Sequence, residues 1–298
     1  MTLRRGRRRA RIGEAAIPYL FIAPAMVGLV VFKLYPIVAG LRMSFYDFQL
    51  ISGRLHFIGL ENYRVMLADP TFWHALRNTL VFNVIVTPLQ VGAALGLALL
   101  VNRTIPRIEI FRSFYFIPAV LPLVVASVIW DLLYHPDNGV FNGILGTLGL
   151  PRQPFLVSAH QAMGAVIAMV TWKGAGYWMV ILLAGLQNIP EQVYEAARIE
   201  GARGWTSFWR ITLPLLSGAL VFVTVADTAI NFLLFAPVYV MTQGGPSEST
   251  TVLMFEVYRN AFVYLHMGYA TAIATVLLAM TLVVVAVQMR VLPVEFEY

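Results

Sequence analysis

Long apolar runs alternate with short polar segments along this chain of 298 residues. Six of the runs can cross the hydrocarbon core of a membrane, because a helix rises about 1.5 Å per residue and the core is about 30 Å thick. They cover residues 16–39, 78–101, 113–134, 162–186, 213–240 and 267–289. The pattern predicts an all-α fold, a polytopic membrane helical bundle of about six transmembrane helices.

The overall composition points to the same class. Hydrophobic residues make up 59% of the chain and charged residues 12%, whereas a soluble domain has about 25% charged residues. The absence of cysteine excludes disulfides and thiolate chemistry. The sequence shows no low-complexity linker or internal repeat, so we expect one membrane domain at 16–290, with a basic N-terminus at 1–15 and a short tail at 291–298.

The N-terminus carries six arginines between residues 4 and 11, just before the first apolar run. Such a cluster is typical of a cytoplasmic anchor on anionic membrane lipid, and we expect no nucleic-acid partner. A secretory signal peptide is the alternative. However, the run at 15–32 is longer than a usual hydrophobic region, and residues 33–36 (KLYP) follow it in place of a small-residue cleavage site. We therefore predict that the first span is retained.

The arginines between the runs orient the spans, because cytoplasmic loops carry an excess of positive charge. With the N-terminus inside, the later cytoplasmic segments hold Arg103, Arg107, Arg112, Arg198, Arg203, Arg210 and Arg290. The external segments hold Arg42, Arg54, Arg64, Arg77, Arg152 and Arg259. We predict a multi-pass protein of the cell membrane, inner or plasma membrane, with both termini in the cytoplasm.

The polar segment at 188–214 stands between the fourth and fifth runs. It cannot cross a membrane, because each charge at the bilayer centre costs about 2.5–3.5 kcal/mol. Asn188 and Glu191 have the spacing of a capping pair with Pro190 in the first turn, and Gly201 can end that helix in a left-handed conformation. A second short helix is predicted at about 205–211. Two helices in an ordinary connecting loop remain the alternative at this point.

The residues of this segment follow a known order. Glu195-Ala196-Ala197 is followed by Gly201-Ala202, and then come Phe208, Ile211, Leu213 and Pro214. This resembles the EAA signature of ABC-importer permeases, in which EAA, a spacer, G and a longer spacer precede I-x-L-P. The resemblance covers essentially the whole chain, and residues 59–63, 172–173, 183–187 and 244–246 are similar to permeases of maltose-type carbohydrate importers.

The resemblance implies a type I ABC importer permease whose segment 188–214 is a coupling helix seated in a cytoplasmic ATPase subunit. The residues that it assigns to this coupling are Glu195, Ala196, Ala197, Gly201, Ala202, Phe208, Ile211 and Pro214. The chain contains no G-x-x-x-x-G-K-S/T loop, so ATP must be used by a partner subunit and no cofactor is expected on this chain. The implied partners are an ATPase dimer, a second homologous permease and an external solute-binding protein, besides membrane lipid.

Polar side chains inside the spans are the candidates for a substrate pathway, because facing them toward lipid is costly. Lys173 and Asp227 are the two ionisable residues well inside, and a structural pair between helices is the alternative reading for them. Asp131 and Glu256 are weaker candidates near the external surface. Hydrogen bonds or stacking for a solute could come from Asn83, Gln90, Trp172, Tyr177 and Asn231.

The class of solute stays open between two branches of the family. Many sugar permeases of the group carry Phe-Asp where this chain has Phe235-Ala236-Pro237, whereas residues 244–251 and 258–262 resemble the glycerol-phosphate branch. An ion-coupled secondary transporter using Lys173 and Asp227 is the rival function. A membrane enzyme is disfavoured, because the five histidines lie at or outside the external edge and form no metal or catalytic cluster.

Overall fold

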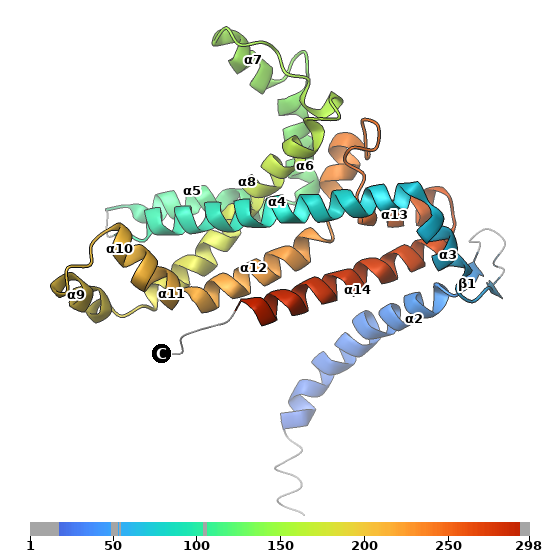
Figure 1. The fold of residues 1–298 in the computed structure, drawn as a ribbon, viewed down its shortest axis with the longest axis horizontal. Helices are drawn as coiled ribbons and strands as arrows, with labels where there is room; N and C mark the ends of the chain where they lie inside the picture. Colours follow the sequence, from blue (N-terminus) through green and yellow to red (C-terminus); the bar gives the residue numbers. More distant parts are fainter. Residues whose placement is uncertain (1–17, 49–52, 54, 104–105, 293–298) are drawn as a thin grey trace, which may run out of the picture.

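The computed structural model describes residues 18–48, 53, 55–103 and 106–292, and it is almost entirely helical (Figure 1). The predicted basic N-terminus at 1–15 and all but the first two residues of the tail lie outside these ranges. Within them, four helices are long and apolar enough to cross a membrane, and two bent helix pairs raise the number to six if each pair is one span. The four are Pro18–Met43, Pro70–Val101 (α4), Ala162–Gln187 (α8) and Met267–Val291 (α14). The predicted all-α bundle is therefore confirmed.

The first helix bends gently around a π-helical turn, η1 (Val30–Leu34), and ends as α2 (Tyr35–Met43). In Figure 1 its N-terminal part diverges from the rest of the bundle, and none of its most apolar stretch is buried. The centre of the bundle is instead formed by α4 and α8, with α12 (Ser217–Asn231) packed against both. Fully buried side chains such as Phe82 and Met169 fill the space between them.

The third apolar run is not one straight helix. It forms α5 (Ile108–Val120) and α6 (Leu123–Tyr134), which meet at an angle of 97°. Leu121 is extended because the residue before a proline is pushed out of helical conformation, and Pro122 has no N–H with which to continue the helix. In Figure 1, α6 turns away from α5 toward the short helix α7 (Val140–Thr147), which is followed by the 3-10 turn η2 (Phe155–Val157).

The fifth run also differs from the expected continuous helix at 213–240. Helix α12 ends at Asn231, and a π-helical turn, η4 (Val238–Thr242), follows after an irregular stretch. The irregular stretch covers residues 232–235, and Pro237 stands at the start of the next helical segment, where its missing N–H costs little. Before α12, the segment Trp205–Leu215 is helical but bent by 68° from it.

One end of the bundle carries a small irregular layer. A hairpin pairs β1 (Tyr46–Phe48) with β2 (Leu55–Phe57) in antiparallel register, and the run pattern did not predict it. Next to it, α3 (Glu61–Ala68) places Asn62, whose side-chain amide donates to the carbonyls of Ser44 and Tyr46 at 2.8 and 3.0 Å. Asp69 caps α4 through the Thr71 N–H, and the segment 250–262 contains α13 (Leu253–Tyr258) and η5 (Arg259–Val263).

The segments predicted to be cytoplasmic gather at the other end. The connection from α4 to α5, the helices α9 and α10 and the end of α14 all lie on the left of Figure 1, while β1 and α3 lie on the right. Arg112 on α5 is bonded to the end of α4, because its Nη2 donates to the Val101 carbonyl at 3.0 Å. The ends of the bundle thus carry different sets of loops, as alternating spans require.

We expect Gly176→Ala to destabilise the protein. Gly176 on α8 faces α5 so closely that an added Cβ would collide with the backbone carbonyl of Tyr115. Forcing extra volume into such a contact costs about 1–3 kcal/mol. On the same helix, Gly164→Ala is the matched control, because nothing lies within 4 Å of its added Cβ. Thermal unfolding in detergent should show a loss only for Gly176→Ala, and equal melting of both variants would contradict the packing.

Candidate functional site

The polar segment 188–214 folds into two helical arms. Helix α9 (Glu191–Ile199) ends in a left-handed Gly201 with a φ of 86°. The Gly201 N–H donates to the Arg198 carbonyl at 3.1 Å and the Ala202 N–H donates to the Ala197 carbonyl at 2.8 Å. This is the double hydrogen bond of a Schellman motif, and it sets the direction in which the chain leaves α9. The predicted role of Gly201 in ending the helix is confirmed.

The predicted capping pair at the start of α9 is wrong. Pro190 itself is the N-cap residue, and no side chain caps the helix. Asn188 belongs to the end of α8, where its N–H donates to the carbonyls of Ala184 and Gly185. Asn188 therefore ends the longer helix α8 and does not cap α9.

The second arm, Trp205–Leu215, consists of α10 (Trp205–Ser207), η3 (Phe208–Thr212) and α11 (Leu213–Leu215). It includes the second helix that the sequence predicted at about 205–211. The hydroxyl groups of Tyr194 and Thr212 lie 3.2 Å apart and link the two arms.

The EAA-type residues are distributed over both arms. Ala197 lies on the buried side of α9, whereas Glu195 and Ala196 are exposed on the same helix. Phe208, Ile211 and Pro214 are half-buried along the second arm. The arms therefore present an acidic outer helix whose direction is fixed by backbone hydrogen bonds and a buried alanine.

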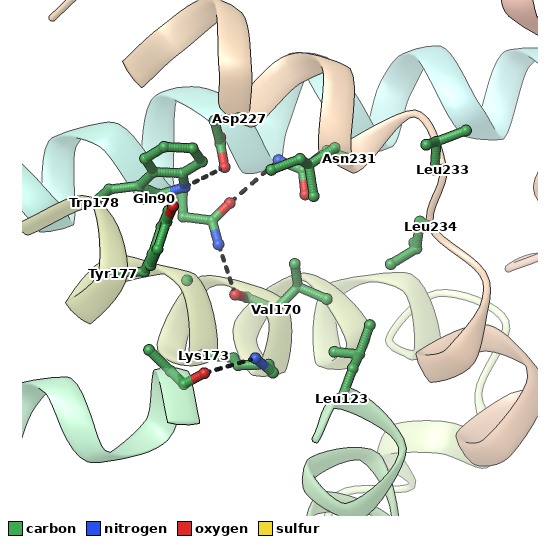
Figure 2. A pocket seen from close by; sticks show the side chains of 13 residues that line it. Gln90, Leu123, Val170, Lys173, Tyr177, Trp178, Asp227, Asn231, Leu233 and Leu234 are labelled. Carbon is green, nitrogen blue, oxygen red and sulfur yellow. Dashed lines mark hydrogen bonds between the residues drawn. The ribbon is translucent and has the colours of Figure 1, made fainter. Parts of the chain in front are cut away.

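A cavity of 370 Å³ lies in the middle of the bundle, between α4, α8 and α12 and beside the break between α5 and α6 (Figure 2). Five of the residues predicted for the substrate pathway line it, namely Gln90, Lys173, Tyr177, Asp227 and Asn231. The rest of the lining is mostly aliphatic. The structure thus brings side chains from three helices, far apart in sequence, to one cavity.

Two sets of hydrogen bonds fix one wall of this cavity. Trp178 Nε1 donates to Asp227 Oδ1 at 2.6 Å, and Asn231 Nδ2 donates to Gln90 Oε1 at 3.2 Å (Figure 2). Gln90 Nε2 in turn donates to the Val170 carbonyl at 2.8 Å. All four of these side chains are buried. Asp227 Oδ2 is buried as well, and the side chains of Thr87 and Asn231 lie close to this carboxylate, although no hydrogen bond to Oδ2 is formed within the described part of the chain.

Lys173 lies on the opposite wall. Its Nζ donates to the Ala119 carbonyl at 3.4 Å, near the end of α5. A cation is favourable there because the last carbonyls of a helix are unpaired and carry partial negative charge. Lys173 and Asp227 form no ion pair with each other in the described part of the chain. The structural inter-helix pair is therefore not formed between these two residues.

Two predicted pathway residues lie elsewhere. Trp172 packs on Trp130, with ring centroids 5.4 Å apart, and lines a separate cavity of 470 Å³ toward α5. Asn83 is buried and donates to the Thr79 carbonyl within α4. Trp178, which orients Asp227, was missed in the sequence, because an indole in an apolar run does not reveal which residue it faces.

The weaker external candidates are occupied by other contacts. Glu256 is buried against Arg259, with Oε1 2.9 Å from Nη2, and burial raises the pKa of its carboxyl group while Arg259 lowers it. Asp131 lines a second cavity of 470 Å³ together with His135 and Thr242. Neither residue reaches the central cavity.

A multi-span helical bundle with a central cavity and a two-armed polar loop at one end is consistent with a membrane transport subunit. Residues 92–293 match the family described as binding-protein-dependent transport system inner membrane component. The chain belongs to this family of ABC importer permeases and is a multi-pass protein of the inner membrane.

The relatives agree with this assignment. The chain is 36% identical to the sulfoquinovosyl glycerol transport system permease protein SmoG of Agrobacterium fabrum over 94% of this chain and 92% of the relative. It is 34% identical to the sn-glycerol-3-phosphate transport system permease protein UgpA of Brucella abortus, over 95% and 96%. It is 36% identical to the lactose transport system permease protein LacF of Rhizobium radiobacter, over 89% and 90%.

The fold has a counterpart among solved structures. A chain of a bacterial alginate ABC transporter, solved in complex with an alginate pentasaccharide-bound periplasmic protein, superposes with a TM-score of 0.83 at 22% identity, covering 97% of this chain and 99% of that one. The similarity supports the overall fold described above.

Proposed function

We propose that this permease moves a carbohydrate or glycerol-phosphate-type solute through the central cavity. The carrying observation is the set of polar side chains from α4, α8 and α12 that line one cavity of 370 Å³ in the middle of the bundle. A polyol needs several fixed donors and acceptors together with an apolar or aromatic face, and the Asp227, Asn231 and Gln90 side chains with Tyr177 supply these. The names of the relatives, which include sugar and glycerol-phosphate systems, favour the same solutes.

Helix α9 is the docking element for a separate ATPase subunit in this proposal. It is exposed, acidic and held at a defined angle by the motif at Gly201. A partner that moves α9 would move the second arm through the link between Tyr194 and Thr212, and with it α12 and the Asp227 wall of the cavity. ATP is used by that partner and not by this chain, whose end with α9 then faces the cytoplasm.

The remaining partners follow from the same scheme. An external solute-binding protein delivers the solute at the end that carries the hairpin and α3, and a second permease completes the pathway. The first helix offers a surface for that permease or for lipid, since Phe21 and Phe32 are 80% and 78% exposed. The relatives favour this assembly over an ion-coupled transporter using Lys173 and Asp227.

The decisive experiment separates the two energy sources. The permease is co-purified with its partners, the solutes retained by the binding protein are identified, and uptake is measured in vesicles. We expect uptake to persist when the membrane potential is dissipated and ATP is maintained, and to stop when ATP is removed. Uptake that is abolished with ATP intact would overturn the proposal in favour of ion coupling.

A further inference from the structure

The second arm of the polar segment exposes an aromatic cluster, of which only Phe208 is among the residues that the family resemblance assigns to coupling. Trp205, Phe208 and Trp209 pack on one another with ring centroids 5.3–5.6 Å apart. Trp205 is nevertheless 74% exposed and Trp209 50% exposed. Large aromatic rings that stack together and still face outward indicate a surface that is covered by something else in the cell.

The charges of the two arms have opposite signs. Residues 191–200 contain three glutamates and one arginine, whereas residues 201–216 contain two arginines and no acidic residue. An anionic surface therefore attracts the second arm and repels the first. Trp and Arg side chains together are also the usual composition of segments that sit at the headgroup level of a membrane.

The direction of the second arm is compatible with a position along the headgroup level of the membrane. Transmembrane helices tilt on average by about 20° from the membrane normal. Because Trp205–Leu215 is bent by 68° from α12, it runs closer to the membrane plane than to the normal. Figure 1 shows α10 and α11 crossing the end of the bundle next to α12, with α9 farther out.

We propose that Trp205, Phe208 and Trp209, flanked by Arg203 and Arg210, form an interfacial anchor that lies on the anionic lipid of the membrane. The arm is joined directly to a predicted span, since α12 follows it after a single residue, Leu216. The anchor holds the base of the polar segment at the membrane while α9 projects from it. This role goes beyond the proposed function, because it assigns lipid and not protein to the second arm.

Spin labelling at single cysteines tests the anchor, and the natural chain contains no cysteine. Trp205→Cys and Trp209→Cys carry the labels, Ile199→Cys on α9 is the matched control at 88% exposure, and Val84→Cys on α4 is the lipid reference at 72% exposure. The permease is reconstituted in vesicles of neutral and anionic phospholipid, with and without its ATPase. Collision of each label with oxygen, which enters lipid, is compared with collision with a water-soluble nickel chelate.

Labels at 205 and 209 should lose collisions with nickel and approach the Val84 reference, with or without the ATPase. The label at 199 should stay accessible to nickel until the ATPase is added, and this measurement tests the docking of α9 separately. Arg203→Gln combined with Arg210→Gln should raise nickel access at 205 in anionic vesicles. Full nickel access at 205 and 209, or protection that requires the ATPase, would overturn the lipid anchor.

A second measurement avoids loss of assembly in the cysteine variants. The native chain and its Trp205→Phe/Trp209→Phe variant, which keeps aromatic rings, are compared in vesicles of brominated lipid. We expect the variant to lose a strongly quenched part of the tryptophan emission. If the lost part is unquenched by brominated lipid, the two indoles face water or protein and the proposal is wrong.

Discussion

Replacing Gly201 with valine is expected to uncouple ATP hydrolysis by the partner subunit from solute uptake, while the permease still inserts and assembles. Gly201 has a φ of 86°, and an added Cβ would have nothing within 4 Å. The cost therefore comes from the left-handed backbone alone, about 1–2 kcal/mol for an ordinary residue, with β-branched residues tolerated least. We expect valine to relieve this strain by leaving the left-handed conformation, which breaks the two hydrogen bonds of the Schellman motif that orient α9. Movement of α9 then no longer reaches α12.

The matched series at this position separates conformation from size. Gly201→Asn should keep coupling near the native level, since asparagine tolerates the left-handed conformation, and Gly201→Ala should fall between the two. The measurement is solute taken up per ATP hydrolysed in reconstituted vesicles, with ATPase copurification as the test of assembly. If Gly201→Val couples ATP hydrolysis to uptake as well as the native protein does, the Schellman motif at Gly201 is not part of the coupling mechanism.

The spans and the two helical arms of the polar segment could be predicted because each leaves a local signal. Runs such as 162–186 and 267–289 are apolar over a full membrane thickness, and the helices α8 and α14 match them closely. Gly201 follows a helical pattern at the position where a left-handed residue is needed. These features depend on residues within one or two turns of each other.

The bends could not be predicted in the same way. Pro118 and Pro122 lie four residues apart in the third run, yet the helix α5 continues past the first and stops before the second. A proline inside a span can be accommodated when neighbours satisfy the freed carbonyl groups. The Ala119 carbonyl, which the end of α5 leaves without an intrahelical donor, accepts from Lys173, 54 residues away, and such a contact is not visible in the local pattern.

The composition of the cavity was predictable only in part for a related reason. Lys173 and Tyr177 are four residues apart and therefore share a face of α8, but the run around them is apolar on all sides. Periodicity consequently could not decide that Trp172, one residue before Lys173, points toward α5 instead. The same ambiguity concealed Trp178, because the position of its partner Asp227 depends on how α12 packs.

Replacing Asp227 with asparagine is expected to lower the apparent affinity for solute strongly while leaving the fold intact. Asparagine keeps the size of the side chain and an oxygen that can accept from Trp178 Nε1, so the internal bond at 2.6 Å can persist. It replaces Oδ2, which is buried in this conformation, with an NH₂ donor, so the proposed hydrogen bond from a solute hydroxyl group to that oxygen is lost. A hydrogen bond to a charged group is worth about 1.5–3 kcal/mol, which corresponds to roughly 10- to 100-fold in affinity.

The control for this variant is Thr228→Val, on the same helix and equally buried. Thr228 accepts from Gln288 at 2.9 Å and does not line the cavity, so its loss should lower the melting temperature and spare solute affinity. Uptake at varied external solute, with assembly and basal ATP hydrolysis measured in parallel, distinguishes the two. If Asp227→Asn transports with native affinity, the carboxylate only orients Trp178, and solute contact must be sought at Lys173, where Lys173→Met would then be the variant that impairs uptake.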